Sequence, residues 1–65
     1  MNSDIFSGKW KQLKGSLQSQ WGKLTDNDLD RIDGNYDQLI GMVQERYGKD
    51  KAQAKKEVEE FLDAL

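Results

Sequence analysis

The chain has 65 residues, a net charge of −2, and neither cysteine nor histidine. Its length suits one small domain over residues 1–65, and the missing residue types exclude disulfides, thiolate or imidazole metal ligands, and nucleophiles activated by histidine. We therefore expect no cofactor, no bound metal and no enzymatic activity. No apolar run approaches the roughly 20 residues of a membrane span, and the N-terminus does not resemble a signal peptide. We expect a cytoplasmic protein without membrane contact.

The charge is divided along the chain. Four lysines and one aspartate give residues 1–23 a charge of +3, whereas six basic and eleven acidic residues give residues 24–65 a charge of −5. Because 34% of the residues are charged and only 35% are hydrophobic, the composition lies near the range of chains that stay unfolded. Partial disorder is therefore an alternative to a fully ordered domain.

The first predicted helix is indicated by four apolar residues with spacings of three, four and four, which share one face: Trp10, Leu13, Leu17 and Trp21. Ser3 or Ser7 is its candidate N-cap, and Gly22 is expected to end it in the left-handed conformation. A second, short helix is predicted from the N-cap Thr25 to about Ile32, with acidic residues in its first turn.

The oxygen-bearing side chains of residues 26–30 are spaced like the start of a calcium loop. The sixth position of that loop is Arg31 rather than the required glycine, so helix capping explains these carboxylates better. Residues 33–35 should end the second helix and begin the third, with Gly34 in the turn and Asn35 as the next N-cap.

The third helix is predicted to end at Gly48, and its apolar face contains Tyr36, Leu39, Ile40, Val43 and Tyr47. The fourth is predicted to begin at Asp50, with Gln53 in the reciprocal capping position. Its buried face is expected to contain Ala54, Val58, Phe61 and Leu62, with Leu65 as a further candidate.

The chain contains an internal repeat. Residues 10–23, WKQLKGSLQSQWGK, return 26 residues later as residues 36–49, YDQLIGMVQERYGK. Such a repeat indicates one supersecondary unit used twice, with neither copy able to bury its apolar face alone. No segment alternates with period two, so we predict an all-α fold of four helices, arranged as two similar αα-hairpins that cross and share one core.

Gly15 and Gly41 occupy equivalent mid-helix positions, where glycine costs about 1 kcal/mol relative to alanine. They lie on the face away from the apolar stripe, together with Lys11 in the first copy and with Asp37 and Glu45 in the second. One interpretation is close approach of another helix, and the opposite charges would suit self-association. The alternatives are helices that are merely weak, or a close crossing within the monomer.

The aromatic residues at the ends of the repeats could stack on bases, but their helical spacing favours core packing. Trp21 and Tyr47 end their apolar stripes and are expected to be partly exposed. We therefore predict a tentative interaction face that contains Lys11, Gly15, Trp21, Gly41 and Tyr47.

A nucleic-acid site would need clustered cations. On a helical wheel the lysines of the first copy point in four directions, so nucleic-acid binding is disfavoured; these are Lys9, Lys11, Lys14 and Lys23.

Motifs along residues 2–58 resemble the CsbD-like family of small bacterial stress proteins: GKWKQLKG, WGKLTDNDL and IDGNYDQLIGMVQERYG. The resemblance implies a cytoplasmic protein of the general stress response, with two orthogonal helical hairpins similar to those of SAM-like domains. It implies no molecular activity. We expect a non-enzymatic protein-interaction module with an unknown partner, which includes self-association; weak non-specific nucleic-acid binding is the alternative.

Overall fold

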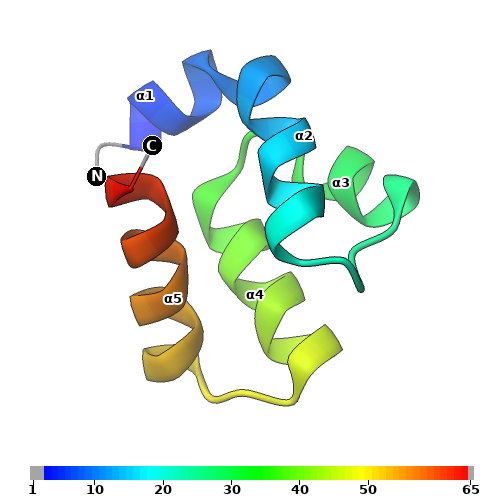
Figure 1. The fold of residues 1–65 in the computed structure, drawn as a ribbon, viewed down its shortest axis with the longest axis vertical. Coiled ribbons are helices and arrows are strands. Elements are labelled where there is room, and N and C mark those ends of the chain that lie inside the picture. Colours follow the sequence, from blue (N-terminus) through cyan, green and yellow to red (C-terminus); the bar gives the residue numbers. More distant parts are fainter. Residues whose placement is uncertain (1–2, 65) are drawn as a thin grey trace.

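The computed structural model describes residues 3–64, and these residues form five helices and no strand (Figure 1). The helices are α1 (Ser3–Gly8), α2 (Trp10–Gln20), α3 (Asp26–Ile32), α4 (Tyr36–Tyr47) and α5 (Lys51–Asp63). The predicted all-α class is confirmed. The predicted count of four helices is wrong, because a separate helix precedes the repeat.

The additional helix α1 ends where the chain turns a corner at Lys9, which has φ −104° and ψ 13° and provides no side-chain cap for α2. Ser7 lies inside α1 and therefore does not cap α2, and the side chain of Ser3 lies outside the described part of the structure. Helix α1 is held against the rest of the fold by the side chain of Phe6. This side chain is fully buried, with its ring 5.5 Å from that of Trp10 and 5.9 Å from that of Tyr36.

The end of α2 differs from the prediction. Gly22 is not left-handed, since the glycines with positive φ in the described residues are Gly34 and Gly48. The helix ends instead at Trp21, whose N–H donates to the Leu17 carbonyl at 2.8 Å while its backbone leaves the helical conformation, with φ −120° and ψ 80°. Only 3% of Trp21 is exposed, and its ring packs edge-on against Phe61 at 5.1 Å. Burial of this ring thus accompanies the exit of the chain from α2.

The other predicted helix starts are confirmed. Thr25 caps α3 in a reciprocal capping box with Asp28. The side chain of Asn35 accepts from the Gln38 N–H at 3.1 Å, and that of Asp50 accepts from the Gln53 N–H at 2.7 Å. The reciprocal bond expected from the side chain of Gln53 is replaced by a bond to Glu57 at 3.1 Å.

One cluster of buried apolar side chains joins the five helices. Tyr36, Tyr47 and Phe61 pack against it but are only partly buried. Phe61 was predicted to be buried and is only partly so. The other predicted core residues confirmed as buried are Trp10, Leu13, Leu17, Leu29, Ile32, Leu39, Ile40, Val43, Ala54, Val58 and Leu62. The cluster also includes Phe6, Leu24 and Met42, which were not predicted, whereas Leu65 lies outside the described residues.

Helix α4 is central to the packing, since it contacts α1, α3 and α5 (Figure 1). The corner between α1 and α2 lies against the turn between α3 and α4. A β-carbon at Gly34 would lie 3.3 Å from both the Cα of Ser7 and the Cβ of Trp10. The orthogonal crossing of two hairpins stays a prediction.

Candidate functional site

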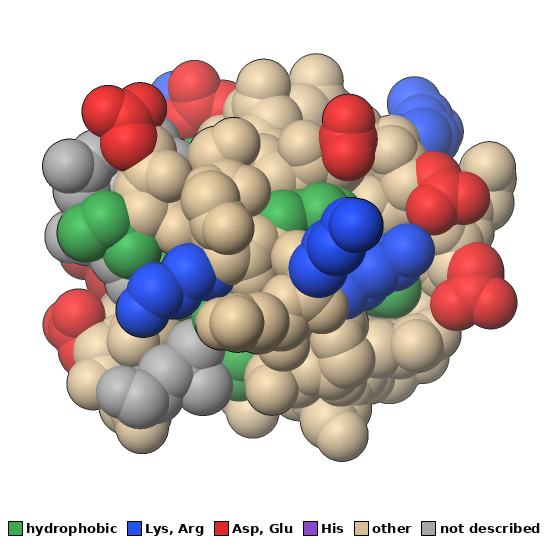
Figure 2. All heavy atoms as spheres, turned by 90° about the horizontal axis from the view of Figure 1, so that it is seen from above, with side chains coloured by type: hydrophobic (Ala, Val, Ile, Leu, Met, Phe, Trp, Pro, Cys, Tyr) green, Lys and Arg blue, Asp and Glu red, His purple; other side chains and the backbone are tan. Residues whose placement is uncertain are grey.

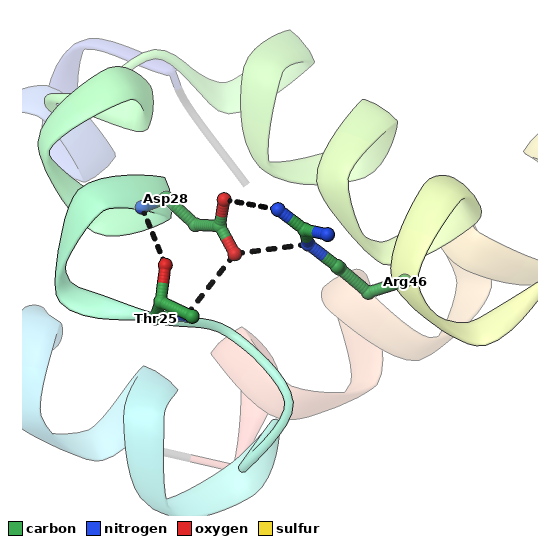
Figure 3. A network of polar contacts seen from close by, with 3 residues as sticks. All are labelled: Thr25, Asp28 and Arg46. Carbon is green, nitrogen blue, oxygen red and sulfur yellow. Dashed lines mark hydrogen bonds and ion pairs between the residues drawn. The ribbon is translucent and has the colours of Figure 1, made fainter.

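The most elaborate polar contact joins α3 to α4. The carboxylate of Asp28 is fully buried, and the guanidinium of Arg46 donates to its two oxygens at 2.7 and 3.0 Å (Figure 3). The Thr25 N–H donates to the same carboxylate at 3.1 Å, and the Thr25 hydroxyl accepts from the Asp28 N–H at 3.1 Å. The first turn of α3 is thus held to the last turn of α4.

These hydrogen bonds control the ionisation of the buried carboxylate. The bonds from Arg46 and then from the Thr25 N–H lower the pKa of Asp28 to about 2, although burial alone would raise it. The same pairing raises the pKa of Arg46 above its ordinary value. Because Asp28 is ionised at neutral pH and already accepts three hydrogen bonds, we assign it a structural role rather than general acid or base chemistry.

The partnership of Asp28 and Arg46 was not predicted. The capping position of Asp28 could be inferred from the spacing after Thr25, but its burial could not. Arg46 is 18 residues away in the second copy of the repeat, and only the packing of α3 on α4 brings the two side chains together.

A second polar cluster forms where the two repeat copies end. The Tyr47 hydroxyl accepts from the Lys23 N–H at 3.1 Å. The ammonium of Lys23 lies 5.0 Å from the centre of the Tyr47 ring and that of Lys49 lies 6.0 Å from it, within the range of cation–π attraction. Lys49 is also paired with Glu57. Tyr47 is half-buried, and both its hydroxyl and its ring contact other residues of the chain.

The structure separates the predicted interaction face into exposed and buried members. Lys11, Gly15 and Gly41 are exposed and Tyr47 is partly buried. Trp21 was expected to be partly exposed, and this is wrong, because its ring packs into the core against Phe61. Trp21 therefore has no surface to offer a partner.

Two exposed helix faces remain. We define the α2 outer face as Lys11, Gly15 and Ser19, and the α4 outer face as Asp37, Gly41 and Glu45; all six residues are exposed. A β-carbon at Gly15 or Gly41 would meet no described atom within 4 Å beyond its own helix and chain neighbours. No close crossing within the described monomer therefore explains these two glycines.

The lysines of the first copy do not share one environment, since Lys14 pairs with an acidic residue whereas Lys23 lies over the Tyr47 ring. Lys14 pairs with Asp30 at 3.4 Å. On the face of the molecule shown in Figure 2, two basic side chains lie next to each other near the centre, and acidic side chains lie around the edge. Trp10, like Trp21, is buried and cannot act as a base-stacking surface, which agrees with the predicted core role of these rings.

The carboxylates that resemble a calcium loop have other partners. Asp26 accepts from Gln18 at 3.2 Å, Asp28 binds Arg46, and Asp30 binds Lys14. Within residues 3–64 there is no group of three acidic, histidine or cysteine side chains arranged to hold a metal ion. Nor is any helix in this range long and apolar enough to cross a bilayer.

The amino-acid sequence of the chain is similar to those of known proteins. A family model described as CsbD-like matches residues 4–56. A UPF0337 protein of Bordetella pertussis is 57% identical over 63 residues, which cover 97% of this chain and 96% of the relative. A UPF0337 protein of Pseudomonas aeruginosa is 52% identical over the full length of both chains. UPF0337 protein YjbJ of Escherichia coli is 56% identical over 61 residues, which cover 94% of this chain and 88% of the relative. No solved structure matches the chain significantly.

Proposed function

Because the chain belongs to the CsbD-like family, we propose that it is a small bacterial stress-response protein that acts in the cytoplasm, without enzymatic activity, as a protein-interaction module. The family supports the stress role, and the lack of histidine and cysteine supports a role without catalysis. The packing of two orthogonal hairpins, similar to SAM-like domains, belongs to the same proposal. Membership of the family supports it.

The interaction role is inferred from the open space above Gly15 and Gly41. A glycine inside a helix lowers its stability by about 1 kcal/mol relative to alanine. No described contact outside their own helices offsets that cost, since the space above both glycines is empty out to 4 Å. Close approach of a partner backbone would account for both glycines, because a side chain at either position would keep that backbone further away.

The test places bulk on these faces while leaving the core unchanged. Gly15→Leu with Gly41→Leu should fold as judged by circular dichroism, but should fail to restore stress survival to a bacterium that lacks its own copy of the gene. The matched control adds bulk at an exposed position of α5 with Ala52→Leu, and it should restore survival. Full protection by the glycine variant would refute an interaction role for these faces.

One observation favours the alternative of weak nucleic-acid binding. Lys23 and Lys49 come from different repeat copies and gather two cations at the ring of Tyr47. An amide NMR titration with mixed DNA and RNA at low salt tests this reading, because phosphate contacts weaken steeply as salt rises. Salt-reversible shifts around Tyr47 would support it, and unmoved peaks would refute it.

A further inference from the structure

The two outer faces occupy equivalent positions in the repeat but have opposite charge. Lys11 corresponds to Asp37, Gly15 to Gly41 and Ser19 to Glu45, each 26 residues apart. Residues spaced by four lie on one side of a helix, so each face places a glycine between two longer side chains. The α2 outer face has one positive charge and the α4 outer face has two negative charges.

The charges on these faces have no salt-bridge partner within the described chain. The salt bridges between described residues join Lys14 to Asp30, Arg46 to Asp28, and Lys49 to Glu57. None of them uses Lys11, Asp37 or Glu45, and all three of these residues are exposed. The two faces are therefore complementary in charge and unoccupied at the same time.

We propose that the α2 outer face of one copy docks on the α4 outer face of a second copy. This inference rests on the proposed function, and it identifies the partner as the chain itself. Gly15 and Gly41 would let the two helix backbones approach, while Lys11 would meet one of the two carboxylates: Asp37 or Glu45, according to whether the two helices run parallel or antiparallel, since these acids lie about 12 Å apart along α4. In this contact the two glycines allow the close approach of the helices, and the opposite charges provide the attraction.

The proposed contact is heterologous, because it joins two different surfaces of the same molecule. Each docked copy leaves one face of each kind free, so association continues into chains unless it closes into a ring. One helix face covers much less than the roughly 800 Å² per partner of a standard stable interface. The association is therefore weak, with a Kd on the order of 0.1 to 1 mM, and it weakens further as salt screens the charges.

Charge exchange tests the docking directly by sedimentation velocity at low salt. The wild-type mass should rise with protein concentration. Lys11→Glu makes both faces acidic, and Asp37→Lys with Glu45→Lys makes both basic, so each variant alone should associate at least about tenfold more weakly. An equimolar mixture of the two variants should regain association, because each acidic face then meets a basic one.

The control is Lys55→Glu, which alters an exposed lysine of α5 outside both faces and should leave the association within about twofold of wild type. A wild-type mass that stays monomeric at millimolar concentration would overturn the inference, as would a variant mixture that does not regain association. If the wild type stays monomeric while Gly15→Leu with Gly41→Leu still abolishes stress survival, only the second copy as partner is refuted, and the interaction role stands with a different protein.

Discussion

Asp28 shows how one residue can join two parts of a small fold. Its buried carboxylate accepts hydrogen bonds from Thr25 in its own helix cap and from Arg46 in α4. Removing this carboxylate takes away its bond to the Thr25 N–H in the capping box and both of its bonds to Arg46, whose side chain is 39% exposed and is then solvated by water. We expect Asp28→Ala to lower the melting temperature by on the order of 10 °C. Asp30→Ala is the control, because Asp30 is exposed and pairs with an exposed lysine; it should change the melting temperature by about 3 °C or less. Equal effects of the two variants in thermal unfolding would contradict a special role for the buried pair.

The same carboxylate should make stability depend on acid. In the folded chain the pKa of Asp28 is about 2, against an ordinary value of 3.8. Since the folded pKa is lowered, the ionised group contributes its full stabilisation above about pH 4, and that contribution is lost as the pH falls towards about 2. The pKa of Glu57 is lowered too, by hydrogen bonds from Lys49 and then from Gln53, so it acts in the same direction. The free energies of unfolding of wild type and Asp28→Asn, measured in urea, should therefore approach each other as the pH falls from about 4 to about 2. A constant difference between them would contradict the assigned pairing.

At the scale of elements, the glycines divide into three environments that predict different results. Gly15→Ala should stabilise α2 by about 0.5 to 1 kcal/mol, because the added methyl group meets empty space. Gly48→Ala should destabilise by about 1 kcal/mol, because φ is +64° there although the space is open. Gly34→Ala should be the most harmful, since it combines φ +77° with contacts of 3.3 Å to Ser7 and Trp10. Urea unfolding of the three variants ranks their free energies of unfolding. If Gly34→Ala were less destabilising than Gly48→Ala, the corner between α1 and α2 would have to shift easily to accept the added methyl group.

The elements were predictable wherever a local signal specified them. Hydrophobic spacing located the apolar faces of α2, α4 and α5, and the caps at Thr25, Asn35 and Asp50 located three helix starts. The separation of α1 from α2 was missed because Phe6 lies four residues before Trp10 and continues the spacing of the same apolar face, so the spacing alone does not reveal the corner at Lys9. The end of α2 was misassigned because burial of Trp21, a tertiary effect, decides its backbone there. For the candidate faces, position in the repeat indicated Gly15 and Gly41, whereas only the fold could show that Trp21 is enclosed.

At the scale of the whole molecule, all five helices contribute to one apolar cluster, so we expect the chain to unfold as one unit. Phe6 tests this expectation, because it lies in the helix outside the repeat and yet is fully buried. Phe6→Ala should cost about 3 to 5 kcal/mol, which is comparable to the entire stability that a single core of this size supplies. Helical circular dichroism and amide NMR dispersion should therefore be lost throughout the chain, including α5 at the opposite end of the sequence. Ile5→Ala is the matched control within α1: 48% of Ile5 is exposed, so this variant should stay folded. Loss of α1 signals alone in Phe6→Ala, with native spectra for α2 to α5, would instead show that the repeat folds independently and that α1 merely docks on it.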